Sequence, residues 1–582
     1  MTRTRLTVLL TAFALVLVAC SDGSTIAAQK ESNRRGEAAD ARPADGSLTW
    51  AACKGKLTAM AGLQCASLAV PLDPTKPDGD TVTIALARKR STGSKSERIG
   101  SLVINPGGPG GSGLEFLANA SAAFPSELTD RFDLVSFDPR GVGESDGVRC
   151  LDDEQKDAQL EGDLTPDTDA ERARMEKDQE DLRSACETRN PALVRHMSTA
   201  DVAADLDRIR EGLGDEKLNF LGYSYGTSIG ATYAAMFPST IRAMVLDGSV
   251  SPSATAIDQA MIQATGFERT LGNFVKACDA DPTCALSPDA AGAIASTRAS
   301  LEADPVKVKG SDGTTRELGR DLFDYGLATG LYDTSTWGPM AQAIKDVRDG
   351  GAETILALVD RQTGRQADGT YDNSADAQVM VNCADQSDRP TAEQAASAAA
   401  DISAAAPTFG PFLSTGLTGC DDWPEPAEPT PPPSADGAPP ILVIGTVGDP
   451  ATPYEWAEQM SGALAGSVLL TYEGDGHTAF LRGGQCVEDA VVTYLVDLTP
   501  PAAGTRCPAK AAGDAFGGVR QELVDQLTES GIPDELATCI VDGMIAEAGE
   551  AKFNDLVLRN DQDAITKLAQ TTALECATSG GG

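Results

Sequence analysis

The chain has little of what a metal site or a nucleic-acid site requires. Only two of its 582 residues are histidine, and no two cysteines stand in a Cys-x-x-Cys pair. A structural metal site is therefore not expected. Basic residues are also few, because 47 lysines and arginines stand against 86 acidic residues and give a formal net charge of −39. So acidic a protein would repel phosphates, which excludes nucleic acid as a partner.

Long apolar runs are absent beyond the N-terminus, since no later segment approaches the roughly 18 apolar residues that a membrane span needs. The N-terminus itself reads as an export signal: Arg3 and Arg5 precede an apolar run over 6–19. That run ends in Leu-Val-Ala-Cys, which resembles a bacterial lipobox. We expect residues 1–19 to be a lipoprotein signal peptide and Cys20 to carry a lipid on the outer face of the cell membrane or envelope. A plain secretory signal with an incidental cysteine is the alternative.

The remaining cysteines agree with export. Thirteen are present, and removing Cys20 leaves an even set, as expected in an oxidising compartment. Pairing neighbours along the chain predicts the disulfides Cys53–Cys65, Cys150–Cys186, Cys278–Cys284, Cys383–Cys420, Cys486–Cys507 and Cys539–Cys576.

Short apolar runs recur along the chain in the manner of buried strands. They lie at 67–71, 81–88, 102–105, 133–137, 219–222, 243–247, 441–445 and 468–472. Helical stretches separate them, and this alternation is typical of a parallel sheet covered on both faces. The fold class is therefore α/β, with a mostly parallel central sheet.

The sequence pattern also divides the chain into segments. Polar residues without periodicity suggest a flexible tether over 20–47. The interval between the sixth and seventh runs is too long for one crossover and reads as largely helical, which predicts a cap inserted into the core. The expected segments are 48–252 for the first part of the core, 253–375 for the cap, 376–510 for the second part of the core with a proline-rich connector at 424–440, and 511–582 for a small C-terminal helical appendage.

Ser224 is the candidate nucleophile. It lies in Gly222-x-Ser224-x-Gly226, between a strand-like run and a helical stretch. This is the spacing of a nucleophile elbow, in which a sharp turn lifts a serine hydroxyl clear of the sheet.

A base and an acid follow in the order that α/β-hydrolases use. His477 lies in a glycine-flanked loop after a predicted strand, and Asp449 lies in a turn after the preceding one. Asp247 is the alternative acid, because it also ends a strand. Asp475 is interpreted as a turn former, and His196 as a surface or capping residue.

A glycine-rich segment over 105–113 follows the predicted strand 102–105 and provides a candidate oxyanion hole. Glycine lets the main chain approach a substrate and turn an N–H toward it. Gly108 and Tyr225 are the expected donors. The segment lacks the Gly-Lys-Ser/Thr ending of a phosphate loop, and no cofactor is expected.

Five motifs together resemble the secreted tripeptidyl-aminopeptidase-like branch of the α/β-hydrolases, relatives of proline iminopeptidases found largely in actinobacteria. They are NPGGPGGSG at 105–113, FDPRGVGES at 137–145, GYSYGT at 222–227, GDPATP at 448–453 and GDGHT at 474–478. The resemblance covers about residues 48–510 and implies an α/β-hydrolase fold with Ser224, Asp449 and His477 as triad. It also implies that Asp138 and Arg140 are structural. Simpler iminopeptidases carry a histidine where this chain has Asn105-Pro106.

The expected activity is hydrolysis through an acyl-enzyme outside the cytoplasm. The first hypothesis is an aminopeptidase that releases short peptides, tripeptidyl or dipeptidyl, from free N-termini. The alternatives are a carboxylesterase acting on envelope lipids or small esters, and an inactive lipoprotein that binds peptides or a partner. An aminopeptidase must also bind an ammonium group, for which Glu115, Asp376 and Asp385 are unranked candidates. The sequence does not indicate an oligomeric state.

Overall fold

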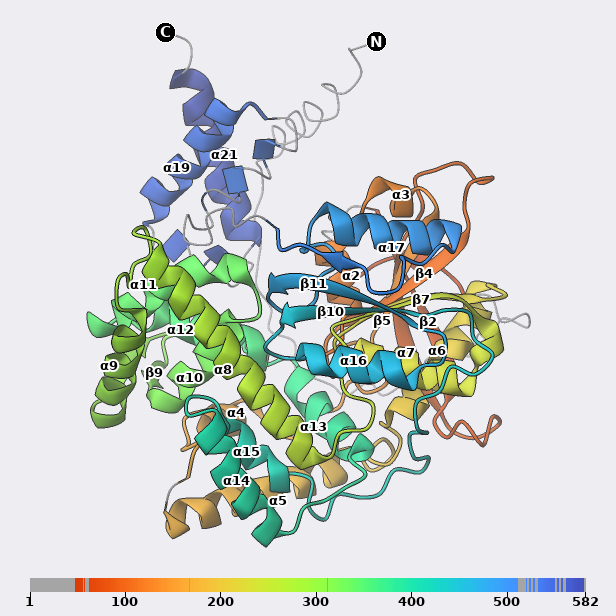
Figure 1. Ribbon diagram of the computed structural model, residues 1–582, viewed down its shortest axis with the longest axis horizontal. Coiled ribbons are helices and arrows are strands. Elements are labelled where there is room, and N and C mark those ends of the chain that lie inside the picture. Colours follow the sequence, from red (N-terminus) through yellow and green to blue (C-terminus); the bar gives the residue numbers. More distant parts are fainter. Residues whose placement is uncertain are drawn as a thin grey trace, which may run out of the picture. The chain divides into compact units, whose positions relative to one another are not determined.

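The computed structural model describes residues 48–510 apart from 56, 58–61, 167 and 311, together with most of 520–579. Its centre is a ten-stranded sheet in the order β1-β2-β3-β5-β4-β6-β7-β10-β11-β12 (Figure 1). From β5 to β12 every neighbouring pair is parallel, whereas β1, β2 and β3 pair antiparallel at one edge. The strands are β1 (Ala51–Ala52), β2 (Leu63–Pro71), β3 (Thr81–Lys89), β4 (Gly100–Asn105), β5 (Phe132–Phe137), β6 (Leu218–Tyr223), β7 (Ile241–Asp247), β10 (Leu442–Gly448), β11 (Val468–Asp475) and β12 (Arg506–Cys507).

Helices cover both faces of this sheet (Figure 1). One face packs against α6 (Thr199–Leu213), α7 (Gly226–Met236) and α16 (Tyr454–Ala463), and the other against α2 (Gly113–Ala120), α3 (Ser126–Thr129) and α17 (Gln485–Asp497). The side chains of successive strand residues alternate between the cores on the two faces. In β4, for example, Val103 belongs to the first core while Leu102 and Ile104 belong to the second. The central strands are therefore apolar on both sides, which explains their continuous apolar runs.

A long helical insertion leaves the sheet after β7 and returns at β10. It contains α8 (Ala256–Ala280), α9 (Ala290–Ala303), α10 (Arg320–Gly330), α11 (Trp337–Arg348), α12 (Glu353–Thr363), α13 (Ser374–Asp385), α14 (Ala392–Ala405) and α15 (Gly410–Ser414), with a hairpin of β8 (Val306–Lys309) and β9 (Thr315–Leu318). Helices α8 to α12 share an apolar core of their own. Helix α13 instead contributes Met380 and Val381 to the core on the α6, α7 and α16 side of the sheet, whereas α14 packs against α8. Helices thus occur beyond residue 375, in the stretch that we assigned from the sequence to the second part of the core.

The sequence-based strands and disulfides are confirmed. Each of the eight apolar runs overlaps a strand, and all six predicted cysteine pairs are bonded. The last of them joins α19 (Asp534–Ala548) to α21 (Gln562–Ser579) in the C-terminal helical segment. Among the described residues, no helix has the length and apolar character that a membrane span needs.

A buried arginine ties the first part of the core together. Two further helices, α4 (Asp153–Leu160) and α5 (Asp169–Arg189), stand between β5 and α6 in the sequence. The Arg140 side chain is fully buried and donates to both Asp205 oxygens, at 2.8 and 2.7 Å. It also donates to the carbonyls of Pro71, Leu72 and His196. Arg140 therefore joins β2, α6 and the segment before α6, as expected for a structural motif.

Removing the Asp205 carboxylate tests this role. Asp205→Ala leaves a buried guanidinium without its bidentate partner, and we expect a loss of about 3–5 kcal/mol in the free energy of unfolding. Urea unfolding followed by circular dichroism measures it. Glu211→Ala on the same helix removes an exposed ion pair with Arg208 and should leave the midpoint unchanged. Equal midpoints for the two variants would contradict the assignment.

Candidate active site

Ser224 stands at the turn between β6 and α7 with a positive backbone φ of 53°. Residues other than glycine rarely adopt this conformation, so contacts with the surrounding structure must hold the turn. The neighbouring glycines permit it, because a Cβ on Gly222 would lie 2.4 Å from the carbonyl oxygen of Gly226. The Ser224 N–H donates to the Asp247 carbonyl at 2.9 Å, which fixes the turn to the end of β7.

His477 and Asp449 are in direct contact. The His477 Nδ1 atom lies 3.0 Å from each carboxylate oxygen of Asp449. Asp449 is fully buried and also accepts the N–H groups of Ala451 and Thr452 and the Thr452 hydroxyl. The carboxylate is thus held in one orientation, and the Nε2 side of the ring is left to meet a reacting group.

The histidine lies beside the serine turn. Gly248 follows Asp247 directly, and a Cβ placed on it would be 3.3 Å from His477 Cε1. Since the Asp247 carbonyl accepts the Ser224 N–H, one strand end adjoins both residues. The structure therefore brings Ser224, His477 and Asp449 to the same edge of the sheet.

The alternative residues occupy other positions. The Asp247 carboxylate accepts the N–H groups of Ala479 and Phe480, so it binds the histidine loop and not the imidazole. Burial raises its pKa to about 6. Asp475 accepts from the Asn273 side chain. The His196 carbonyl binds the Arg140 network, and burial lowers the pKa of its ring.

The glycine-rich loop lies against the serine. A Cβ on Gly107 would fall 2.9 Å from the Ser224 Cβ and 2.9 Å from the Tyr225 nitrogen, so only glycine fits there. Among the described residues, neither the Gly108 N–H nor the Tyr225 N–H donates to another residue of the chain. These donors are therefore available to an oxygen beside Ser224.

Asp138 binds the end of the glycine-rich loop. It accepts the Ser112 hydroxyl at 2.7 Å, the Leu114 N–H at 3.1 Å and the Glu144 N–H at 2.9 Å. The carboxylate is buried, and desolvation raises its pKa. Asp138 thus joins the start of α2 to the loop after β5, in agreement with the structural role expected for its motif.

The cap also contacts the histidine loop. The Tyr332 carbonyl accepts the His477 N–H at 2.7 Å, and the two rings meet edge to face at 5.3 Å between centroids. Asp333 pairs with Arg482 at 3.1 Å. No motif around residues 332–333 predicted these contacts, because the bond from His477 uses a main-chain carbonyl that every residue carries.

The three candidate ammonium-binding acids differ in their surroundings. Asp376 is buried and pairs with Lys156 at 2.6 Å. Asp385 accepts from Thr199 and Thr430, and burial raises its pKa. Glu115 is exposed in the first turn of α2, directly after the glycine-rich loop.

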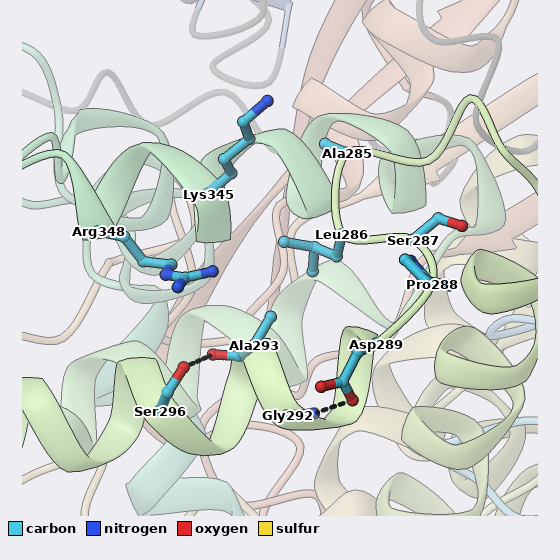
Figure 2. Close-up of a pocket in the computed structure, with 10 residues that line it drawn as sticks. All are labelled: Ala285, Leu286, Ser287, Pro288, Asp289, Gly292, Ala293, Ser296, Lys345 and Arg348. Atoms are coloured by element: carbon cyan, nitrogen blue, oxygen red, sulfur yellow. Dashed lines mark hydrogen bonds between the residues drawn. The ribbon is translucent and has the colours of Figure 1, made fainter.

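One pocket of the described chain lies away from these residues. A pocket of about 360 Å³ lies on the cap, lined by residues of 285–296 together with Lys345 and Arg348 (Figure 2). None of the residues at the serine turn, the histidine loop or the glycine-rich loop lines it. The described residues contain no group of three histidine, cysteine or acidic side chains that could hold a metal ion.

Comparison with known proteins identifies the family. The α/β-hydrolase fold model matches residues 100–483. Serine protease Hip1 of Mycobacterium tuberculosis is 36% identical, over 79% of this chain and 91% of its own length. Carboxylesterase B of the same organism is 34% identical over 76% and 86%, and the tripeptidyl aminopeptidase of Streptomyces lividans is 31% identical over 81% and 89%. The resemblance seen in the motifs is thereby confirmed: the chain belongs to the α/β-hydrolase fold family and is an enzyme of its serine hydrolase branch.

Proposed function

We propose that the protein is an exported serine aminopeptidase that releases short peptides from free N-termini. Ser224 is the nucleophile, His477 the general base, Asp449 the orienting acid, and Gly108 and Tyr225 the oxyanion donors. The observation that carries the proposal is the pair of 3.0 Å contacts between His477 Nδ1 and the buried Asp449 carboxylate, beside a serine held at positive φ.

The proposed reaction follows from these positions. His477 Nε2 takes the proton of the Ser224 hydroxyl, whose oxygen attacks the scissile carbonyl. The negative charge that develops on the carbonyl oxygen is held by the Gly108 and Tyr225 N–H groups. His477 then protonates the leaving amine, and a water molecule activated by the same ring releases the acyl group from Ser224. Asp449 stabilises the imidazolium and fixes the tautomer throughout.

The preference for peptides rests on two considerations. Two of the three relatives named above are called a protease and an aminopeptidase. Glu115 places an exposed carboxylate in the first turn after the oxyanion loop, where an ammonium group of a bound peptide could meet it. The relative named Carboxylesterase B makes ester hydrolysis the second candidate, because the same triad serves both reactions.

The proposed location outside the cytoplasm rests on the disulfides. Six cystines in one chain are typical of an oxidising compartment. The signal peptide, the tether and the lipid site Cys20 lie outside the described residues. We propose that a lipid on Cys20 holds the enzyme at the outer surface of the membrane.

Replacing the nucleophile tests the mechanism. Ser224→Ala should abolish labelling by a fluorophosphonate probe and lower kcat by about 10⁴-fold or more, because no covalent intermediate can form. Labelling is read by gel fluorescence and kcat from initial rates. Ser228→Ala, one helical turn further along α7, is the matched control and should label normally. Labelling of Ser224→Ala at the wild-type rate would remove Ser224 from the mechanism.

A set of substrates separates peptidase from esterase. We expect turnover of unblocked tripeptide amides, little turnover of the same peptides after N-acetylation, and a KM for free peptides raised about two- to fivefold in Glu115→Gln. Chromatography of the products measures this, with Glu127→Gln on α3 as control. If p-nitrophenyl esters are cleaved and no free peptide is, the enzyme is an esterase.

The lipid anchor is tested by fractionation. Cys20→Ser removes the only thiol at the end of the signal, and with it the attachment point of the lipid chains whose burial in the bilayer anchors such a protein. The variant should therefore move from the membrane fraction to the soluble extracytoplasmic fraction, as followed by immunoblot. Unchanged partition would mean that another segment anchors the protein.

A further inference from the structure

The loop that carries His477 is held by its backbone. Four consecutive N–H groups, from His477 to Phe480, all donate hydrogen bonds. The His477 N–H donates to the Tyr332 carbonyl at 2.7 Å, and the Thr478 N–H to Asp449 at 3.2 Å. The next two donate to a single side chain, Asp247.

Asp247 receives these two bonds at short range. The Ala479 N–H lies 3.0 Å from each carboxylate oxygen, and the Phe480 N–H lies 2.7 Å from Oδ2. The main-chain carbonyl of the same residue accepts the Ser224 N–H at 2.9 Å. Asp247 therefore binds the turn of the nucleophile with its backbone and the loop of the base with its side chain.

We propose that Asp247 is a positioning residue, which sets the place of His477 relative to Ser224 by holding the histidine loop to the end of β7. The proposal rests on the triad proposed above and adds a second acid to it. Asp449 orients the imidazole ring, whereas Asp247 fixes the main chain from which that ring projects. Neither aspartate can replace the other, because their hydrogen bonds reach different atoms.

The charge of Asp247 makes this positioning depend on pH. The side chain is fully buried, and among the described residues no lysine or arginine forms an ion pair with it. The titratable groups that face it are His477, Asp449 and the buried Tyr223 hydroxyl. Burial raises its pKa from 3.8 to about 6, against the lowering effect of the Phe480 and Ala479 hydrogen bonds. Acidification through about pH 6 therefore removes the charge that strengthens both bonds.

Protonation of Asp247 on acidification does not lower activity by unfolding the protein. A carboxyl group whose pKa is raised by folding binds its proton more tightly in the folded state. The stability that Asp247 contributes is thus fully present below pH 3.8 and is lost as the pH rises through about 6. Protonation near pH 6 favours the fold while it weakens the hold on the histidine loop.

The test compares Asp247→Asn with a matched control. Asparagine keeps one acceptor oxygen for the two N–H groups but carries no charge, so kcat and the rate of fluorophosphonate labelling at pH 8 should fall about tenfold, with KM unchanged. In the wild type, the acid limb of kcat/KM should fall more steeply than in Asp247→Asn, since the protonation of Asp247 near pH 6 weakens the hold on the histidine loop. In Asp247→Asn, the slope of the acid limb should correspond to the uptake of a single proton.

Asp324→Asn is the control. Asp324 is likewise a buried aspartate whose pKa is raised by burial to about 6, but it pairs with Arg298 within the cap. This variant should keep the wild-type labelling rate and acid limb. Thermal melting at each pH reports whether the variants are folded.

The outcomes separate the two proposals. A wild-type protein that does not react with the probe contradicts the proposed function itself. If the wild type reacts, and Asp247→Asn reacts as fast with the same acid limb, the positioning role is wrong. If Asp247→Asn does not fold, the acid limb of kcat/KM in the wild type is the test. A slope that corresponds to the uptake of one proton overturns the inference, and a steeper slope supports it.

Discussion

The carboxyl ends of four neighbouring parallel strands are the constraint on which the site depends. In the register of the sheet Tyr223 lies opposite Asp247, Asp247 opposite Ile444, and Gly448 opposite Asp475. The residues that follow these ends are Ser224, Asp449 and His477, which lie far apart in the sequence. Parallel pairing alone places them at one edge. A shift of one residue in any of these strands would turn a site residue toward the other face of the sheet.

Placing acids at that edge has an electrostatic cost, and the structure offsets it with backbone donors. Asp449, Asp247 and Asp138 are each buried, and each accepts at least two main-chain N–H groups. Such donors supply partial positive charge without adding a cation that would compete with substrate or alter the histidine. The buried Arg140–Asp205 pair, by contrast, lies among structural elements, where a full ion pair does not interfere with the chemistry. Function thus decides which kind of partner a buried aspartate receives.

Much of the fold could be predicted because its signals are local. Apolar runs marked the strands, the Gly-x-Ser-x-Gly spacing marked the turn at Ser224, and pairing neighbouring cysteines gave the six disulfides found among the described residues. The function of Asp247 could not be read in the same way, since its partners are main-chain N–H groups that any residue except proline provides. The contact from Tyr332 uses a carbonyl, which carries no sequence signal either. Helical periodicity likewise could not show that α13 joins the core of the sheet while α14 packs on α8, because a helix of either kind has one apolar face.

The insertion is bonded to the loop that carries His477. The chain leaves the sheet directly after Asp247, at the edge that carries the site, and returns at the start of β10, which then leads to Asp449. From within the insertion, Tyr332 binds the His477 N–H and Asp333 pairs with Arg482 just beyond the histidine loop. The cap is therefore part of the histidine's support, because one of the four N–H groups of that loop depends on the cap for its acceptor.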